Sequence, residues 1–253
     1  SEINHEINQL LDADIATLRI HASHGFAVAR VPALFLDHPG IQLDLRYLGT
    51  HDSLASLARG GCDLAGFHLP EGVYGRMAAR QYRRWLDNDR YRVVHLVTRT
   101  QGLFLSAGNP KGIGALADLT RPDVLFVNRQ SGSGTRLLFD QLLEAEGIAG
   151  EEIHGYETEE YTHAAVAAYV ASGMADVGFG VQPAAHQLRL DFVPVATEQY
   201  FFALETGALD RPEIGEFLSM LRSPAFQEVV AELPGYTAPR AGEVARIDDV
   251  FPG

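Results

Sequence analysis

Short strand-like segments alternate with helix-like segments along almost the whole chain, and this order constrains the fold more than any single motif. The strand-like segments combine β-branched or apolar residues with an alternating or compact apolar pattern. They are residues 18–23, 41–48, 63–67, 91–106, 123–127 and 176–180. The helix-like stretches between them include residues 28–35, 54–58, 74–87, 137–143 and 162–172. Strands that alternate with helices predict an α/β fold.

A weak internal repeat relates the two halves of the chain. Residues 58–70 (ARGGCDLAGFHLP) align without gaps on residues 171–183 (ASGMADVGFGVQP). In both copies a helix ends at Gly, an Asp begins a buried strand and a Pro ends the unit. The match favours two related lobes, and two unrelated joints of the same kind remain the alternative.

The charge balance excludes several classes of partner. The formal net charge is −13 and the pI is near 5.1, so this domain is not expected to contact nucleic acid directly or to hold an anionic membrane face. An anion site must therefore act locally, through backbone N–H groups and Arg side chains. No apolar run is long enough for a membrane span, and the single Cys62 excludes an internal disulfide or a thiolate metal cluster.

The first residues have apolar side chains at helical spacing but lie before the first strand pattern. Residues 1–16 are interpreted as a linker helix, because Ile3, Ile7, Leu10, Leu11 and Ile15 follow a roughly helical period. An N-terminal helix of the same domain is the alternative. No signal-peptide pattern is present in this stretch.

A Gly-rich loop between a predicted strand and a predicted helix is the strongest local motif. Glycines let the backbone approach an anion closely, and the start of the helix directs free N–H groups toward it. Hydroxyl and guanidinium groups add further donors to the loop. The candidate ligand-binding residues here are Arg129, Gln130, Ser131, Ser133, Gly134, Thr135 and Arg136. A helix N-cap with surface arginines is the alternative reading.

The same loop lacks the signatures of better-known sites. It has no Lys after its second Gly, as a Walker A loop requires, and no dinucleotide fingerprint follows the first strand. It also departs from the nucleophile elbow, because Ser131 stands where that motif has Gly. We therefore expect no catalytic residue, no cofactor and no metal site.

Small polar residues also follow the other predicted strands. In open α/β sheets ligands bind at the carboxyl ends of strands, so these loops are expected to meet the Gly-rich loop in one cleft. The candidates are Ser23, His24, Thr50, His51, His68, Thr162 and His163. Taken singly, each of them fits a cap or a turn equally well.

Five strings together resemble the periplasmic-binding-protein-like domain related to molybdate-binding proteins. They are VNRQSGSGTR at 127–136, GY at 155–156, THAAVA at 162–167, GMADVG at 173–178 and LDFVP at 190–194. The resemblance covers about residues 18–205, and the GSGTR string also resembles phosphate-binding proteins.

The resemblance implies a two-lobed type II periplasmic-binding-protein fold. Lobe 1 would comprise residues 17–98 and 200–253, and lobe 2 would comprise residues 99–199. The two crossing segments would form a hinge at Thr98, Arg99, Gln199 and Tyr200. Closure of the lobes would desolvate the anion and strengthen its hydrogen bonds.

Members of this family often follow helix-turn-helix segments or are fused to molybdopterin-synthesis enzymes, where they are thought to sense molybdate or tungstate. The resemblance therefore implies a non-catalytic, cytoplasmic sensor domain of a transcriptional regulator, with a homo-oligomer assembled through a missing N-terminal DNA-binding segment as one arrangement. The alternative is a periplasmic receptor of an ABC transporter for phosphate, molybdate or an organic acid. Arg and His near the loop depart from the neutral sites of molybdate receptors, and histidine contacts predict stronger binding on acidification.

Overall fold

The computed structural model describes residues 15–251 and confirms the α/β class. One mixed sheet has the strand order β2-β1-β3-β8-β4-β7-β5-β6, and β9 and β10 both pair with β4. The strands are β1 (Ala16–Ala22), β2 (Ile41–Tyr47), β3 (Leu64–Pro70), β4 (Tyr91–Leu105), β5 (Phe126–Arg129), β6 (Glu159–Glu160), β7 (Val177–Val181), β8 (Asp191–Glu205), β9 (Tyr236–Thr237) and β10 (Val244–Arg246). The β1–β2, β1–β3, β5–β6 and β5–β7 pairs are parallel, and β4 and β8 run antiparallel to each other.

Helices cover the sheet on either side. The α-helices are α2 (Thr50–Ala58), α3 (Val73–Tyr82), α4 (Gly134–Ala145), α5 (His163–Ala171), α6 (Gln182–Gln187), α7 (Pro212–Leu221), α8 (Pro224–Ala231) and α9 (Ile247–Val250). Short 3-10 helices are η1 (Val28–Arg30), η2 (Pro32–Phe35), η3 (Leu116–Thr120), η4 (Gly150–Glu152) and η5 (Thr206–Asp210). None of the helices within residues 15–251 is long and apolar enough to cross a membrane.

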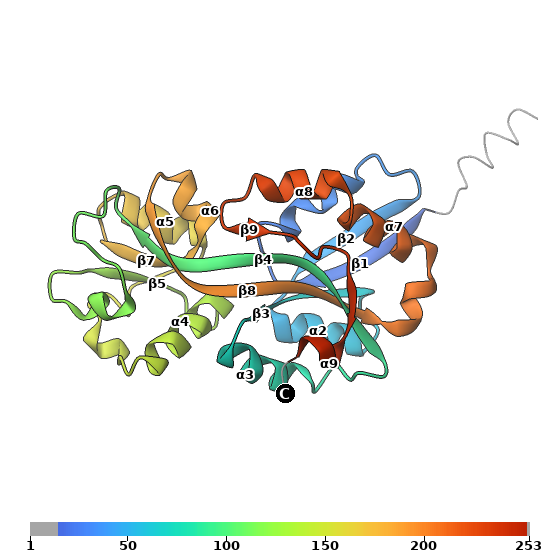
Figure 1. Cartoon of the computed structure of the whole chain (residues 1–253), viewed down its shortest axis with the longest axis horizontal. Coiled ribbons are helices and arrows are strands. Elements are labelled where there is room, and N and C mark those ends of the chain that lie inside the picture. Colours follow the sequence, from blue (N-terminus) through green and yellow to red (C-terminus); the bar gives the residue numbers. More distant parts are fainter. Residues whose placement is uncertain (1–14, 252–253) are drawn as a thin grey trace, which may run out of the picture.

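Two lobes lie at opposite ends of the long strands β4 and β8 (Figure 1). The chain leaves the first lobe along β4 and returns along β8, and these strands pair from Tyr91 opposite Glu205 to Leu105 opposite Asp191. The predicted hinge residues lie in the middle of this ladder, where Thr98 pairs with Gln199. Whether the lobes move about this point stays a prediction.

Separate apolar cores hold each lobe together. Two clusters of buried side chains draw on residues 18–97 and 200–251, and two others draw on residues 103–185. Phe202 and Phe217 pack edge to face in the first lobe, with ring centroids 5.6 Å apart, and Phe126 stacks on Phe139 in the second. Because each lobe buries its own core, the space between them is left for a ligand.

Three local expectations need correction. The helix expected from the spacing of residues 28–35 is replaced by η1 and η2, which meet at Pro32, a residue without the N–H that a continuous helix requires. The strand expected at 123–127 is shifted to Phe126–Arg129. Of the proposed linker helix 1–16, residues 1–14 lie outside the described residues, and Ala16 belongs to β1, where it pairs with Ile41.

The internal repeat corresponds to the same joint in both lobes. Helices α2 and α5 are each followed by a glycine with positive φ, 76° at Gly60 and 78° at Gly173. The following Asp then bridges to the neighbouring parallel strand: Asp63 Oδ2 accepts the Arg19 N–H at 2.8 Å. Asp176 Oδ2 accepts the N–H of Leu125, just before β5, at the same 2.8 Å. The repeat therefore marks equivalent structural positions.

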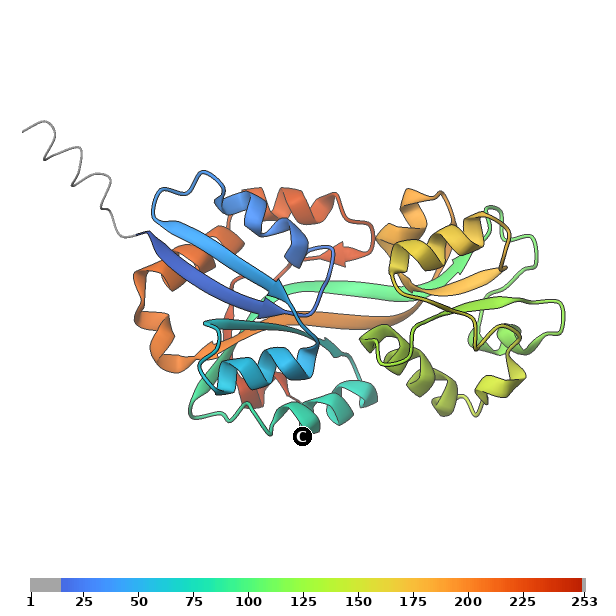
Figure 2. The ribbon, with the colours of Figure 1, turned by 180° about the vertical axis from the view of Figure 1, so that it is seen from behind.

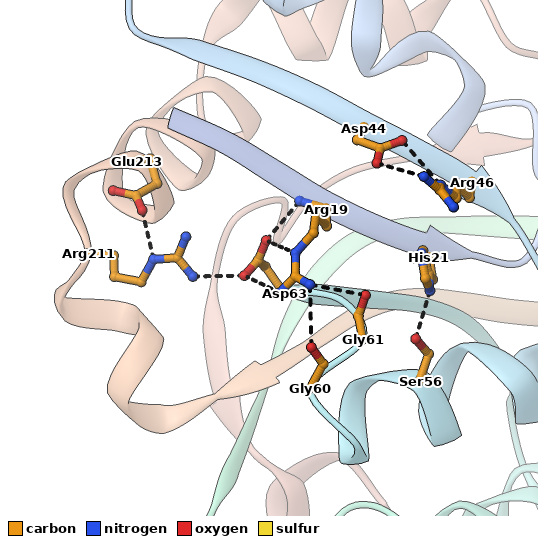
Figure 3. A network of polar contacts seen from close by, with 10 residues as sticks. All are labelled: Arg19, His21, Asp44, Arg46, Ser56, Gly60, Gly61, Asp63, Arg211 and Glu213. Atoms are coloured by element: carbon orange, nitrogen blue, oxygen red, sulfur yellow. Dashed lines mark hydrogen bonds and ion pairs between the residues drawn. The ribbon is translucent and has the colours of Figure 1, made fainter. Parts of the chain in front are cut away.

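Each of these carboxylates is also paired with a cation. Asp63 accepts Arg211 Nη1 at 2.9 Å and so connects β1 and β3 to the segment before α7 (Figure 3). Asp176 accepts Lys111 Nζ at 2.8 Å. Burial alone would raise the pKa of Asp63, but the Arg19 N–H and the two guanidinium groups lower it below the ordinary value.

Candidate functional site

A cavity of about 420 Å³ lies between the two lobes. The first lobe contributes the residues that follow β1 and β2, part of β3, and helices α2 and α3. The second lobe contributes the loop after β5, the first turns of α4 and the start of α5. Figure 2 shows the ends of α3 and α4 near each other where the two lobes meet.

Most of the candidate residues from the sequence meet in this cavity. Those that line it are Ser23, His24, Thr50, His51, His68, Arg129, Ser133, Gly134, Thr135 and His163. Gln130, Ser131, Arg136 and Thr162 do not line it, and of the predicted hinge residues only Arg99 does. That the lining residues bind a ligand stays a prediction.

Helix α4 presents free N–H groups to the cavity. Ser133 is its N-cap, and the Ser133 hydroxyl oxygen accepts the Arg136 N–H at 3.1 Å. Within the described part of the chain the N–H groups of Gly134 and Thr135 have no acceptor. Helices α2 and α5 also begin at the cavity, with Thr50 and His163 as their first residues. Three helix N-termini therefore add positive potential at one place.

Arg129 brings a positive charge that no carboxylate neutralises within residues 15–251. Its Nε donates to Gln130 Oε1 at 3.1 Å and its Nη2 donates to the Tyr161 carbonyl at 3.3 Å. Partial burial and the nearby Arg99 guanidinium lower the pKa of Arg129 to about 10. The group stays charged at neutral pH and favours an anion in the cavity.

A buried ion pair forms another part of the cavity wall. Arg99 Nε donates to Glu198 Oε2 at 2.7 Å, and Gln101 Nε2 donates to the same oxygen at 2.8 Å. The side chains of Arg99 and Glu198 are 5% and 4% exposed, so both charges are removed from bulk water. Because Glu198 compensates Arg99, the uncompensated positive charge among the described lining residues is that of Arg129. The Asp52 carboxylate in the first turn of α2 also lines the cavity.

Four histidines line the cavity, and three of them, His24, His68 and His163, interact electrostatically with these arginines and are called the cavity histidines. His68 Nδ1 lies 3.0 Å from the Ser23 hydroxyl, and Tyr200 Oη donates to the Ser23 carbonyl at 2.8 Å. His163 Nδ1 is buried without a hydrogen-bond partner among the described residues.

All three cavity histidines are held in the neutral form. Burial is the largest cause for each. The positive charge of Arg99 lowers all three pKa values further, and that of Arg129 also lowers those of His24 and His163. The pKa values of His68 and His163 fall well below the ordinary value. An anion placed here would oppose these arginine charges and raise the pKa values.

Arg136, the second arginine of the Gly-rich loop, is turned away from the cavity. Its Nε donates to Asp140 at 3.0 Å and its Nη1 donates to Glu159 at 2.9 Å. The guanidinium also lies 4.4 Å from the ring centroid of Tyr156. These contacts give Arg136 a role in holding the loop and the first turns of α4.

The remaining candidates outside the lining also have local partners. The Gln130 side chain accepts from Arg129, and the Ser131 N–H donates to Glu159 Oε1 at 3.1 Å. Thr162 is the N-cap of α5, and its hydroxyl oxygen accepts the Ala165 N–H at 3.0 Å.

Sequence reasoning missed the lining residues that come from helix α3 and from the body of α4. They include Ala78, Gln81, Tyr82, Leu137, Leu138 and Gln141. Their residue types fit any amphipathic helix, so no local signal separates them from ordinary core or surface positions. Arg99 was expected at the hinge, and its pairing with Glu198 depends on the register of β4 and β8.

The described residues contain no group of three His, Cys, Asp or Glu side chains arranged to hold a metal ion. Besides the carboxylates of Asp52 and Glu198, the cavity lining gathers donors: guanidinium groups, backbone N–H groups and hydroxyls. Such a set recognises a negatively charged oxygen group through charge-assisted hydrogen bonds.

A family model described as "PBP superfamily domain" matches residues 33–222. The uncharacterized protein YvgK of Bacillus subtilis (strain 168) is 33% identical over 201 residues, which cover 79% of this chain and 64% of YvgK. The chain thus spans less than two thirds of that relative's length.

Solved structures share the fold at low sequence identity. A substrate-binding domain assigned to a molybdenum ABC transporter from Clostridium difficile has a TM-score of 0.59 and 19% identity, covering 88% of this chain and 98% of that one. A phosphate transport receptor from Vibrio cholerae has a TM-score of 0.63 and 15% identity, with coverage of 88% and 100%. The regulatory domain of MetR, a LysR family regulator from N. meningitidis, has a TM-score of 0.59 and 13% identity, with coverage of 88% and 99%. These matches confirm the type II fold.

Proposed function

The chain belongs to the PBP superfamily, and from this premise we propose that the cavity between its lobes binds a small oxyanion without catalysing a reaction. Molybdate and tungstate are the first candidates, because the motif strings resemble those of the molybdate-related domains. The fold shared with a domain assigned to a molybdenum transporter is consistent with this choice.

The observation that carries the proposal is the uncompensated charge of Arg129 beside the free N–H groups of α4. A partly buried guanidinium with no carboxylate partner in residues 15–251 is unfavourable unless a ligand supplies the negative charge. The Gly134 and Thr135 N–H groups supply directed donors at the same wall.

Titration calorimetry with molybdate, tungstate, sulfate and phosphate tests the proposal. We expect one of these anions to bind and the Arg129→Gln variant to lose at least tenfold in affinity, since a charge-assisted hydrogen bond contributes about 1.5–3 kcal/mol. Arg246→Gln is the matched control, because Arg246 lies on β10 and does not line the cavity. Unchanged affinity in the Arg129 variant would place the anion elsewhere.

In this proposal the domain is the sensor of a cytoplasmic transcriptional regulator. The resemblance to domains that follow helix-turn-helix segments supports this role, and MetR provides an example of the fold in a regulator. A mobility-shift assay with the complete gene product and the DNA upstream of its gene tests it. Binding that changes on addition of the anion is expected, and absence of DNA binding with and without the anion contradicts it.

An ABC transporter receptor is the second candidate function. The whole-chain match to a phosphate transport receptor favours it, although at 15% identity that match concerns the fold alone. Fractionation of cells expressing the complete gene separates the two: a cytoplasmic protein supports the sensor, and an extracytoplasmic one supports the receptor.

A further inference from the structure

The cavity is larger than a bare oxyanion requires. Its volume is about 420 Å³, whereas five heavy atoms displace on the order of two or three waters, or roughly 60–90 Å³. A volume of this size falls in the range of sites that hold small organic molecules. Most of the space would therefore be filled by something other than the anionic group.

The part of the cavity between α3 and α4 has apolar side chains beside the polar Gln81 and Gln141. Leu137 and Leu138 come from the first turns of α4, and Ala78 and Tyr82 come from the facing helix α3. Leu137 lines the cavity and is 55% exposed, whereas Leu138 is 2% exposed and Tyr82 is 8% exposed. Both ribbon views place the ends of these helices beside each other (Figures 1 and 2). Here Leu137 offers an apolar surface of which protein side chains leave more than half uncovered.

Aromatic rings extend this apolar wall on the first lobe. His51 at the start of α2 lies edge-on to Tyr82, with ring centroids 6.0 Å apart, and is tilted against Trp85 at 5.4 Å. Tyr82 is fixed in turn by its hydroxyl, which donates to the His68 carbonyl at 3.2 Å. Ordered rings of this kind offer a face or an edge to a ring of a ligand.

The two ends of the cavity are joined by a single helix. The N-terminus of α4 directs the Gly134 and Thr135 N–H groups at the anion site, and Leu137 follows within the same turn. A ligand whose anionic group binds the N–H groups at the start of α4 therefore has Leu137 within reach of its body.

We propose that the preferred ligand is a small organic anion with one negatively charged oxygen group and an apolar body about the size of a benzene ring. This inference rests on the proposed anion site. The charged group binds Arg129 and the α4 N-terminus, and the body packs between Leu137 and Tyr82.

Matched ligands test the inference by titration calorimetry on the full chain. The pairs are phenyl phosphate against inorganic phosphate and benzoate against acetate, with benzyl alcohol as the uncharged ring. We expect the ring-bearing member of at least one pair to bind tenfold or more tightly than its partner, because burial of a ring removes apolar surface from water. Benzyl alcohol should bind more weakly than the ring-bearing anion.

A variant pair locates the apolar subsite. Leu137→Ala should weaken the ring-bearing anion roughly five- to tenfold, the fold-change for covering about half of a leucine side chain, and should leave its small partner unchanged. Leu188→Ala is the control, since Leu188 is 42% exposed and does not line the cavity.

The outcomes separate this inference from the proposed function. If inorganic phosphate, molybdate or acetate binds as tightly as every ring-bearing anion, the apolar subsite is refuted and the anion site stands. If benzyl alcohol binds as tightly as the ring-bearing anions, the charged group contributes nothing and the inference of an organic anion fails. If no anion binds at all, both proposals fail. If Leu137→Ala and Leu188→Ala behave alike, the ring does not lie on α4.

Discussion

Replacing Arg129 by Gln should stabilise the protein without ligand and at the same time remove its response to anions. The Arg129 guanidinium is partly buried, lies near Arg99 and has no carboxylate partner in residues 15–251. A charge in that environment destabilises the folded state until an anion arrives. Stability and ligand affinity should therefore change in opposite directions.

The magnitude follows from the pKa of Arg129, which burial and Arg99 lower to about 10. The difference from the ordinary arginine value of about 12.5 corresponds to about 3 kcal/mol at roughly 1.4 kcal/mol per pKa unit. The two hydrogen bonds to Gln130 and Tyr161 offset about 1 kcal/mol each. Arg129→Gln should thus stabilise the unliganded protein by about 1–2 kcal/mol.

The full destabilisation by the Arg129 charge is present at neutral pH. Because the pKa of Arg129 is depressed in the folded state, the folded and unfolded chains differ in bound protons only above about pH 10. Stability would rise with pH in that alkaline window, whereas at pH 7 the destabilisation by this group is complete and does not change with pH. A calorimetric scan at pH 7 therefore measures the whole free-energy cost of burying the Arg129 charge.

Differential scanning calorimetry without added anions provides the measurement. For a domain of this size the expected stabilisation raises Tm by roughly 2–8 °C. Arg246→Gln, which removes an exposed charge on β10, should leave Tm nearly unchanged. A lower Tm for Arg129→Gln in anion-free buffer would refute the reasoning, because it would mean that Arg129 is compensated within the protein.

Four further predictions concern titration and local geometry. Sulfate affinity should rise as pH falls from about 8 to 5.5, up to about tenfold per pH unit for each cavity histidine that takes up a proton, and calorimetry showing a flat profile would exclude the coupling. The depressed pKa values also mean that stability without ligand, measured by urea unfolding, declines below about pH 6.5, where the unfolded histidines take up protons first. Asp63→Asn should lower the free energy of unfolding by about 1.5–3 kcal/mol through its buried charge-assisted bonds, whereas Asp123→Asn at an exposed pair should change it by less than about 1 kcal/mol. Gly180→Ala would place a Cβ 2.6 Å from His163 Nδ1, so anion affinity should fall, while Gly207→Ala, with open space around it, should bind normally.

Much of the fold followed from local patterns. Strand 41–48 and the extended run 91–106 correspond to β2 and β4 within one residue. The joints that contain Asp63 and Asp176 occupy equivalent places in the two lobes. Such patterns are readable because apolar spacing and turn residues act over a few positions.

Other features depended on contacts that the sequence does not order. The segment with helical spacing at 28–35 is divided into η1 and η2 at Pro32. Leu137 and Tyr82 have the residue types of ordinary helix positions, and only the approach of α4 to α3 places them in one cavity. No spacing rule connects residues that meet across two lobes.

The two arginines of the Gly-rich loop, Arg129 and Arg136, separate what the sequence determined from what only the tertiary structure decided. By itself the sequence determined that this loop precedes a helix and carries anion-type donors, because capping by Ser133 and the free N–H groups of α4 involve only neighbouring residues. Only the tertiary structure decided which arginine faces the cavity. Arg136 is neutralised by Asp140 and by the distant Glu159, whereas Arg129 meets no carboxylate within residues 15–251. The physical reason is that a charge is compensated by whatever the fold brings within a few ångströms, regardless of separation along the chain.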